Sequence, residues 1–163
     1  MAADKNPAEC VVEAVDRCLA LAATWHAWDG IPIARIDDEG RSNTWTPYKA
    51  LRRIADHLLD HLQEVEALLA GAEPVPDHWH GRLVTLDADW SRFTELDLDE
   101  ARSRLTRLAR CLLLRYAAAG PEAWDAPRGE AWTLRAIAEH VANVTWYAEQ
   151  VGALPVQAAD AKG

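Results

Sequence analysis

The feature that most limits the fold of this 163-residue chain is the helical spacing of apolar residues in four separate segments. In each segment, apolar side chains recur every three or four residues, which places them along one stripe of a helix. The second segment, for example, carries Leu51, Leu58 and Val65 on such a stripe. Strand patterns are nearly absent. The sequence therefore predicts an all-α protein with helices at about 7–25, 47–70, 98–119 and 134–151.

Residues typical of helix ends flank these segments. Asn6 precedes Pro7 and is expected to cap the first helix, because proline suits the first helical position. Asp97 and Glu100 have the spacing of a capping box at the start of the third helix, which Gly120 ends. These positions fix the expected helix boundaries.

Four helices that are each apolar on one stripe pack economically around one shared core, so we expect a single-domain four-helix bundle over 1–163. Long loops follow the first and second helices, at 27–45 and 72–96. Loops of this length are typical of a crossover or of a functional segment. The stretch 31–33 and the turn 38–40 are compatible with a small hairpin in the first loop.

The net charge and the lengths of the apolar runs indicate which partners and which cellular location to expect. Seventeen basic and 26 acidic side chains give a formal net charge of −9, which disfavours binding to nucleic acid. The apolar runs are too short to span a membrane, and the first residues lack the pattern of a signal peptide. We expect a cytoplasmic protein that binds neither nucleic acid nor membranes.

Cys10, Cys18 and Cys111 each lie among apolar residues of a helical segment. Three cysteines cannot all pair within one chain, and a reduced thiol in such a setting behaves as a small hydrophobic group. The sequence therefore predicts reduced cysteines that pack in the core.

Eight tryptophans are present, and seven of them fall in predicted loops or at helix ends. Two interpretations remain open. The rings either cover the ends of the bundle and hold the loops against it, or they line a ligand pocket beneath a loop.

An internal repeat is the most informative feature for function. LRRIADHL at 51–58 aligns with LRAIAEHV at 134–141 with five identities in eight positions, and a Trp-Thr pair precedes each copy at a different distance. His57 and His140 occupy the same position in the two copies and hence the same helical phase relative to the apolar stripe. Two helices are thus expected to present equivalent imidazoles.

His61 follows His57 by four residues, so both rings lie on one side of the second helix, where His140 could join them. Three neutral imidazoles suit Zn²⁺, Ni²⁺ or Fe²⁺ and leave a coordination position open for water or substrate. Asp60 and Glu64 lie near this side and could accept imidazole N–H bonds. The alternative is a solvated helix face with ordinary surface charges.

Other candidate residues are weaker. His26 is expected to end the first helix, although it could also act as a substitute ligand, and His78 and His80 are expected on the surface of the second loop. Tyr147 could offer a phenol to a bound ligand, but packing of its ring is favoured. Glu149 is expected to pair with an arginine.

The segments WTLRAIAEHVANVTWY and LRRIADHLLDH resemble the DinB/YfiT-like superfamily, in which a Trp-Ser/Thr pair begins a helix and a histidine follows an Arg-x-Ile/Val pattern. This resemblance implies a four-helix bundle with a long crossover and, in many members, a divalent metal held by three histidines. The usual arrangement has one histidine on the second helix and a His-x₃-His pair on the last. Here the distribution is reversed, with Val144 at the position of the missing partner of His140.

The resemblance also implies a reaction class. Its characterised members include transferases and isomerases that use mycothiol or bacillithiol, and some hydrolases. We therefore expect a metal-dependent enzyme that transfers a low-molecular-weight thiol to a small electrophile or catalyses hydrolysis. The alternatives are a metal-free module that binds a small molecule and a structural homodimer without catalysis.

Overall fold

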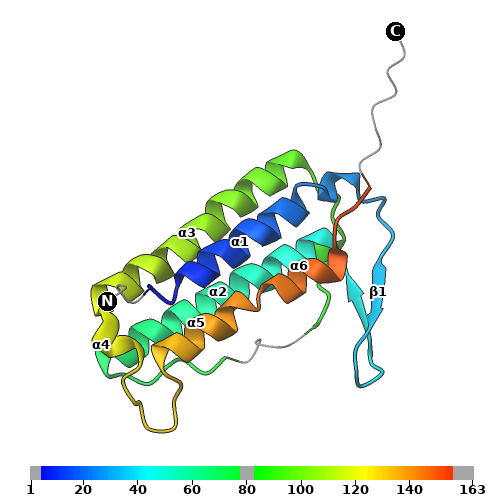
Figure 1. Cartoon of the computed structure of the whole chain (residues 1–163). Helices are drawn as coiled ribbons and strands as arrows, with labels where there is room; N and C mark the ends of the chain where they lie inside the picture. The colour runs from blue at the N-terminus through cyan, green and yellow to red at the C-terminus, as the bar shows by residue number, and fades with distance from the viewer. Residues whose placement is uncertain (1–4, 78–82, 156–163) are drawn as a thin grey trace.

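The computed structural model describes residues 5–77 and 83–155, and most of them lie in helices (Figure 1). The α-helices are α1 (Glu9–Ala22), α2 (Pro47–Ala70), α3 (Glu95–Ala119), α4 (Pro121–Trp124), α5 (Leu134–Ala142) and α6 (Thr145–Val151). The loops contain the 3₁₀ helices η1 (Trp25–Ala27) and η2 (Asp87–Trp90) and the strands β1 (Ile33–Ile36) and β2 (Ser42–Trp45). The prediction of a mainly helical protein is confirmed, with a small two-stranded sheet in addition.

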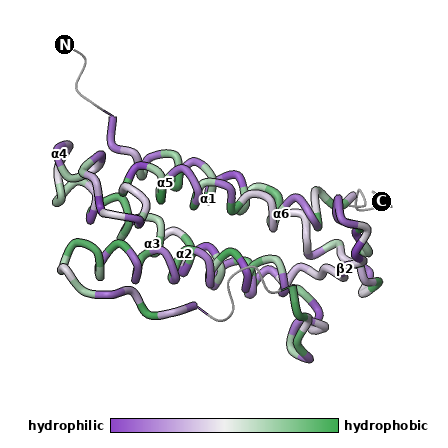
Figure 2. The backbone as a smooth tube through the Cα atoms, turned by 90° about the horizontal axis from the view of Figure 1, so that it is seen from below, coloured by the Kyte–Doolittle hydropathy of each residue, from purple (hydrophilic) through white to green (hydrophobic). Residues whose placement is uncertain are grey.

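The long helices pack side by side. Both α1 and α2 contact α3 and the consecutive pair α5 and α6. Figure 1 shows α1, α5 and α6 running in one direction and α2 and α3 in the other, so the chain after α2 returns along the molecule before α3 begins. Seen from below in Figure 2, α1, α5 and α6 form one row and α2 and α3 the other. The stripes of all these helices meet in one apolar core.

The predicted helix starts are correct for α2 and α5 and shifted for the other two predicted helices. Thr46 caps α2 by accepting a hydrogen bond from the Lys49 N–H at 3.2 Å. The first helix begins at Glu9 and not at residue 7, because Asn6 accepts from the Ala8 N–H and forms a turn before the helix. It ends at Ala22 and not at residue 25, because the chain turns at Ala23 and continues in the separate 3₁₀ helix η1.

The third helix begins three residues earlier than predicted. Thr94 is its N-cap and accepts from the Asp97 N–H, while the Asp97 carboxylate accepts from the Thr94 N–H at 2.8 Å. Asp97 is thus the reciprocal member of the capping box and not the cap itself. Glu100, the predicted partner of Asp97, instead pairs with Arg104.

The predicted helix over 134–151 is two helices. Asn143 and Val144 donate backbone hydrogen bonds to residues three positions earlier, which makes a tight turn between α5 and α6. The sequence Asn-Val-Thr at 143–145 explains the turn, because all three residue types have low helix propensity. The turn also directs Val144 fully into the core.

The hairpin in the first loop is confirmed, with its strands at 33–36 and 42–45. It extends beyond the end of the helices in Figure 1. Asp37 holds its turn by accepting from the backbone N–H groups of Glu39 and Arg41. Gly40 has a φ of 76°, which a residue with a side chain rarely adopts.

Lys49 joins this hairpin to the return loop. Its buried ammonium group donates to the Thr44 carbonyl at 2.5 Å, to the Thr85 hydroxyl at 2.9 Å and to the Leu83 carbonyl. Burial lowers the pKa of Lys49 to about 8. The three acceptors compensate for the removal of this cation from water.

All three cysteines are free, as predicted, and core packing is confirmed for Cys18, in part for Cys10, and not for Cys111. Cys18 is fully buried, and burial raises the pKa of its thiol to about 12. Cys10 is half-buried and donates to the Pro7 carbonyl, whereas Cys111 is exposed. Cys111 lies on the outer side of α3, where its position in an apolar run of the sequence is no guide to burial.

Several tryptophans hold the ends of the helices together. The Trp25 indole donates to the Gly152 carbonyl at 2.7 Å, and the Trp124 indole donates to the Tyr116 carbonyl at 2.9 Å. Trp45 is buried among aromatic rings. For these residues the covering role is confirmed, and Trp79 lies outside the described residues.

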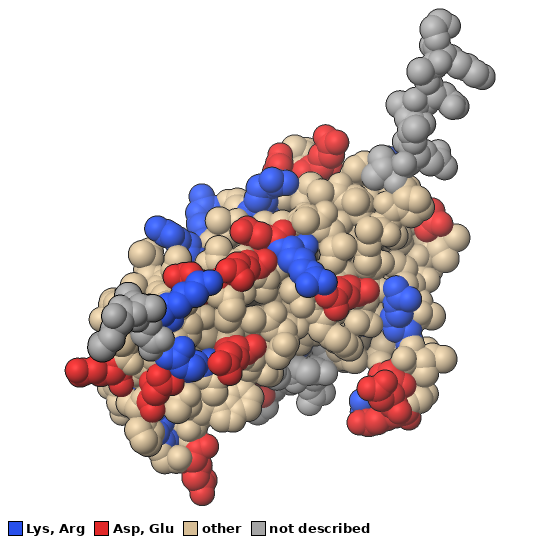
Figure 3. All heavy atoms as spheres, viewed as in Figure 1, with Lys and Arg blue, Asp and Glu red and all other residues tan. Residues whose placement is uncertain are grey.

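The surface seen in Figure 3 mixes the two signs of charge, because basic and acidic side chains alternate over α1, α3 and the α5–α6 row. Arg17 and Glu149, for example, form an ion pair at 3.4 Å, as predicted for Glu149. Among the described residues, none of the helices combines the length and the apolar character that crossing a bilayer requires.

Candidate metal centre

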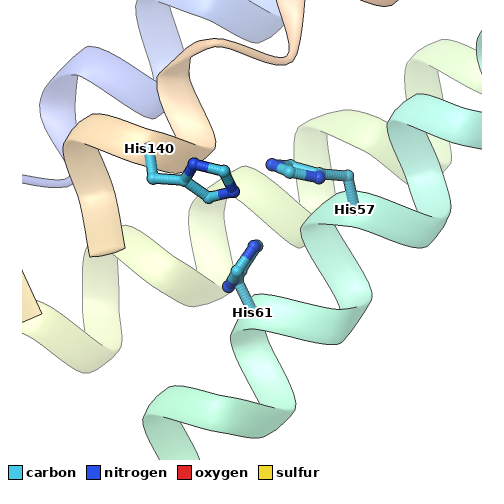
Figure 4. Close-up of side chains that lie close together, drawn as sticks. All are labelled: His57, His61 and His140. Carbon is cyan, nitrogen blue, oxygen red and sulfur yellow. The ribbon is translucent and has the colours of Figure 1, made fainter. Parts of the chain in front are cut away.

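Three imidazoles from two helices converge on one point. His57 and His61 come from α2 and His140 comes from α5, and Figure 4 shows the three rings turned toward one another. Their ring centroids are 4.7–4.9 Å apart, and one nitrogen from each ring lies within 4.8 Å of the others. The structure thus brings together all three residues of the predicted ligand set.

Helix geometry explains this convergence. His57 and His61 are four residues apart on the uninterrupted helix α2, so their rings lie one above the other. The Thr133 hydroxyl accepts from the Ala136 N–H and fixes the start of α5, which places His140 opposite the pair. His57 and His61 are buried and His140 is half-buried, so the group lies at the edge of the core.

Glu64 orients one of the rings. His61 Nδ1 lies 2.6 Å from a Glu64 carboxylate oxygen, a distance at which the imidazole N–H donates to the carboxylate. This bond places the proton on Nδ1 and leaves the Nε2 lone pair directed at the other two rings. Of the two acids named from the sequence, Glu64 makes the imidazole contact, and Asp60 lines the adjoining cavity.

These residues fit a transition-metal ion. Two nitrogens bound to one zinc ion at about 2.0–2.1 Å each lie no more than about 4.2 Å apart, so small ring rotations bring the three nitrogens into coordinating distance. Three imidazoles with a carboxylate acceptor behind one of them match the donor preferences of Zn²⁺, Ni²⁺ and Fe²⁺. Within the described residues, this is the group of side chains that could hold a metal ion.

A cavity of about 440 Å³ opens beside His61 and His140. Its walls come from α2, from the segment 74–77 and from the segment 130–132. The Trp132 ring meets the His140 ring edge to face at 5.0 Å and forms an aromatic side of this space. A small molecule in the cavity would lie next to two of the three imidazoles.

The opposite side of the histidine group is aromatic and cationic. Tyr147 packs its ring against His57 at 5.8 Å and against Trp45 at 6.0 Å, which confirms the predicted packing role of this ring. The guanidinium of Arg53, one helical turn before His57, lies over the Tyr147 ring at 5.8 Å and is almost fully buried. Sequence reasoning missed Arg53, although its spacing of four from His57 was a usable signal.

The remaining candidates lie elsewhere. His26 is exposed in η1, where its Nδ1 lies 3.1 Å from the Ala23 carbonyl, and the prediction that it ends the first helix is wrong because α1 already ends at Ala22. Val144 is fully buried in the core. His78 and His80 lie outside the described residues.

No protein-family model, curated protein or solved structure matches this chain. The function is therefore argued from the geometry of the histidine group.

Proposed function

We propose that this protein is a four-helix bundle of the DinB/YfiT type that binds one divalent transition metal through His57, His61 and His140. In this proposal it acts on a small molecule as a transferase of a low-molecular-weight thiol, such as mycothiol or bacillithiol, or as a hydrolase. The convergence of three imidazoles from the two helices α2 and α5 is the observation that carries the proposal.

The packing of the helices supports the bundle assignment. Two rows of helices, α1 with α5 and α6, and α2 with α3, enclose one core, and a long return loop precedes α3. In this description α5 and α6 together serve as the fourth helix of the bundle.

The chain's own groups divide the work at the site. The three imidazoles would bind the metal ion. Glu64 holds the His61 ring so that its Nε2 points at the other two rings. The cavity beside Trp132 places the substrate next to His61 and His140, and its walls combine the Trp132 ring and Val75 with the carboxylates of Asp60, Glu64, Asp77 and Glu130. A bound divalent ion supplies Lewis acidity, which lowers the pKa of a coordinated thiol or water.

Elemental analysis of protein purified without an affinity tag is the first test. The proposal predicts about one transition-metal ion per chain. The second test follows thioether formation between mycothiol, bacillithiol or cysteine and 1-chloro-2,4-dinitrobenzene, a reaction that forms the C–S bond and releases chloride and the thiol proton. Hydrolysis of p-nitrophenyl acetate is measured in parallel.

The expected result is a rate in one of these assays that disappears on chelation and returns with metal. His57→Ala is expected to lose both metal and rate, and His26→Ala is the matched control that keeps both. Absence of metal binding, even after incubation with zinc, would contradict the proposal and favour a metal-free binding module. A mass by light scattering that rises with concentration, without metal, would favour a structural dimer.

A further inference from the structure

A second cavity lies on the flank of α2 away from the histidines. It has a volume of about 320 Å³ and lies between α2, α3 and the segment 88–93. Its apolar lining includes Leu51, Ala55, Phe93, Ala101 and Leu105. None of the three histidines lines it, and it is separate from the cavity beside Trp132.

The most buried charged groups in the cavity wall, Arg52 and Asp89, form an ion pair with each other. Arg52 donates to both carboxylate oxygens of Asp89 at 3.0 and 2.7 Å, and the Leu86 N–H donates to the same carboxylate at 2.8 Å. Burial acts to raise the pKa of Asp89, but these hydrogen bonds outweigh it and hold that pKa below its usual value. Asp89 therefore stays ionised and bound to Arg52 at neutral pH.

The charged groups nearer the rim are also paired. The Tyr48 hydroxyl donates to Asp97, and Arg104 pairs with Glu100. Asp56 lies 3.8 Å from Arg52 and accepts from Arg53 at 3.3 Å. A charged ligand would have to displace one of these partners, whereas a neutral apolar ligand leaves every pair intact.

Two aromatic rings shape the remaining space. Tyr48 and Phe93 pack edge to face with their ring centroids 5.7 Å apart. Trp25 packs edge to face against Phe93, with a centroid distance of 6.1 Å. Such rings favour the edges and faces of another aromatic ring. An apolar cavity of about 150 Å³ accommodates benzene, so about twice that volume suits a molecule of one or two rings.

We propose that this cavity, lined by Tyr48, Leu51, Ala55, Phe93, Ala101 and Leu105, is a binding site for a small, neutral aromatic molecule. The site is independent of the metal centre, because it uses the opposite flank of α2 and the neighbouring helix α3. It gives the protein a second ligand, bound without chemistry, beside the substrate of the histidine site.

The probe that tests this site is 1-fluoronaphthalene, observed by ¹⁹F NMR. Its resonance is expected to broaden saturably with wild-type protein and equally with His57→Ala, which separates this site from the proposed function. Ala101→Phe and Ala55→Leu fill the cavity and are expected to weaken binding by at least about tenfold. Ala117→Phe places the same side chain on the exposed side of α3 and is expected to bind as the wild type does.

Two further measurements make the result decisive even where a filled variant folds poorly. Phe93 is the sole phenylalanine of the chain, so selective labelling gives one ring whose nuclear Overhauser contacts with the probe are expected in wild-type protein. The anion 4-fluoro-1-naphthoate is expected to bind at least about tenfold more weakly than the neutral probe. Absence of saturable binding, absence of contacts to Phe93, equal binding of the anion, or unchanged binding by a folded Ala101→Phe variant would each overturn the proposal.

Discussion

The two copies of the internal repeat align over eight positions, but their helices supply different numbers of histidines to the candidate metal site. In both copies the helix is capped by a threonine that precedes the copy. In both, the arginine at the second position forms a bidentate ion pair with an aspartate outside its helix. After the first copy, α2 continues for several more turns, so this helix supplies His61 in addition to His57. The copy in α5 ends at Ala142 and supplies one.

The difference comes from the residues that follow each copy. After the first copy, Leu-Asp-His continues the helix and keeps His61 in phase with His57. After the second, the tight turn at Asn143 breaks the phase, so Val144 enters the core four residues after His140. The same motif thus becomes a two-ligand or a one-ligand element according to whether its helix continues.

Among the paired positions of the two copies, the tryptophans that precede them are expected to differ most in their contribution to the free energy of unfolding. Trp45 is fully buried, and Trp45→Ala is expected to lower the free energy of unfolding by about 3–5 kcal/mol. Trp132 is half exposed, and Trp132→Ala is expected to cost about 1 kcal/mol or less. Urea denaturation followed by circular dichroism measures both values, and equal losses would show that the two positions are equivalent.

The arginines at the second repeat position give the next largest contrast. Arg52→Met leaves the Asp89 carboxylate buried without its main partner and is expected to destabilise the fold by about 2–4 kcal/mol. Arg135→Met frees the exposed Asp125 and is expected to leave the unfolding midpoint near that of the wild type.

The contrast between these arginine variants depends on pH. The Asp89 pKa is lowered in the folded state, so its stabilising contribution is present at neutral pH and is lost as the pH falls through that pKa. The loss of unfolding free energy caused by Arg52→Met is expected to become smaller as the pH falls from about 7 to about 4. Protonation of Asp89 in the variant removes its buried unpaired charge. A deficit that stays constant over this range would contradict the assigned role of the pair.

Glu64 offers a smaller and more specific test of the α2 copy. Glu64→Gln replaces the carboxylate that accepts from His61 and is expected to weaken zinc binding by about 10–100-fold without unfolding the protein. Glu66→Gln is the matched control, since Glu66 pairs with Arg115 instead. Titration with zinc in the presence of a chromophoric chelator measures both affinities, and equal losses in the two variants would indicate a general charge effect.

The sequence allowed much of this arrangement to be predicted, because helical phase relates residues that are a few positions apart. Phase placed His57 and His61 on one side of α2, and the repeat placed His140 at the equivalent position of a second helix. The residues of α2 were also correct from Pro47 to Ala70, since a proline and a glycine mark its ends.

Choices between chemically similar neighbours could not be made from the sequence. Thr94 and Asp97 are both good caps at compatible positions, and Asp60 and Glu64 both lie near the histidine side of α2. The burial of Arg53 was missed because an arginine beside an apolar stripe is usually solvated. Each of these outcomes depends on contacts between segments that are distant in sequence.

The central claim is that imidazoles from two different helices share one ion, and zinc affinity of the His140→Ala variant tests it most directly. Chelator competition is expected to give one ion per chain for wild type and for His26→Ala, and an affinity weaker by at least about 100-fold for His140→Ala. Wild-type zinc affinity in a folded His140→Ala variant would show that α5 contributes no ligand and would contradict the account.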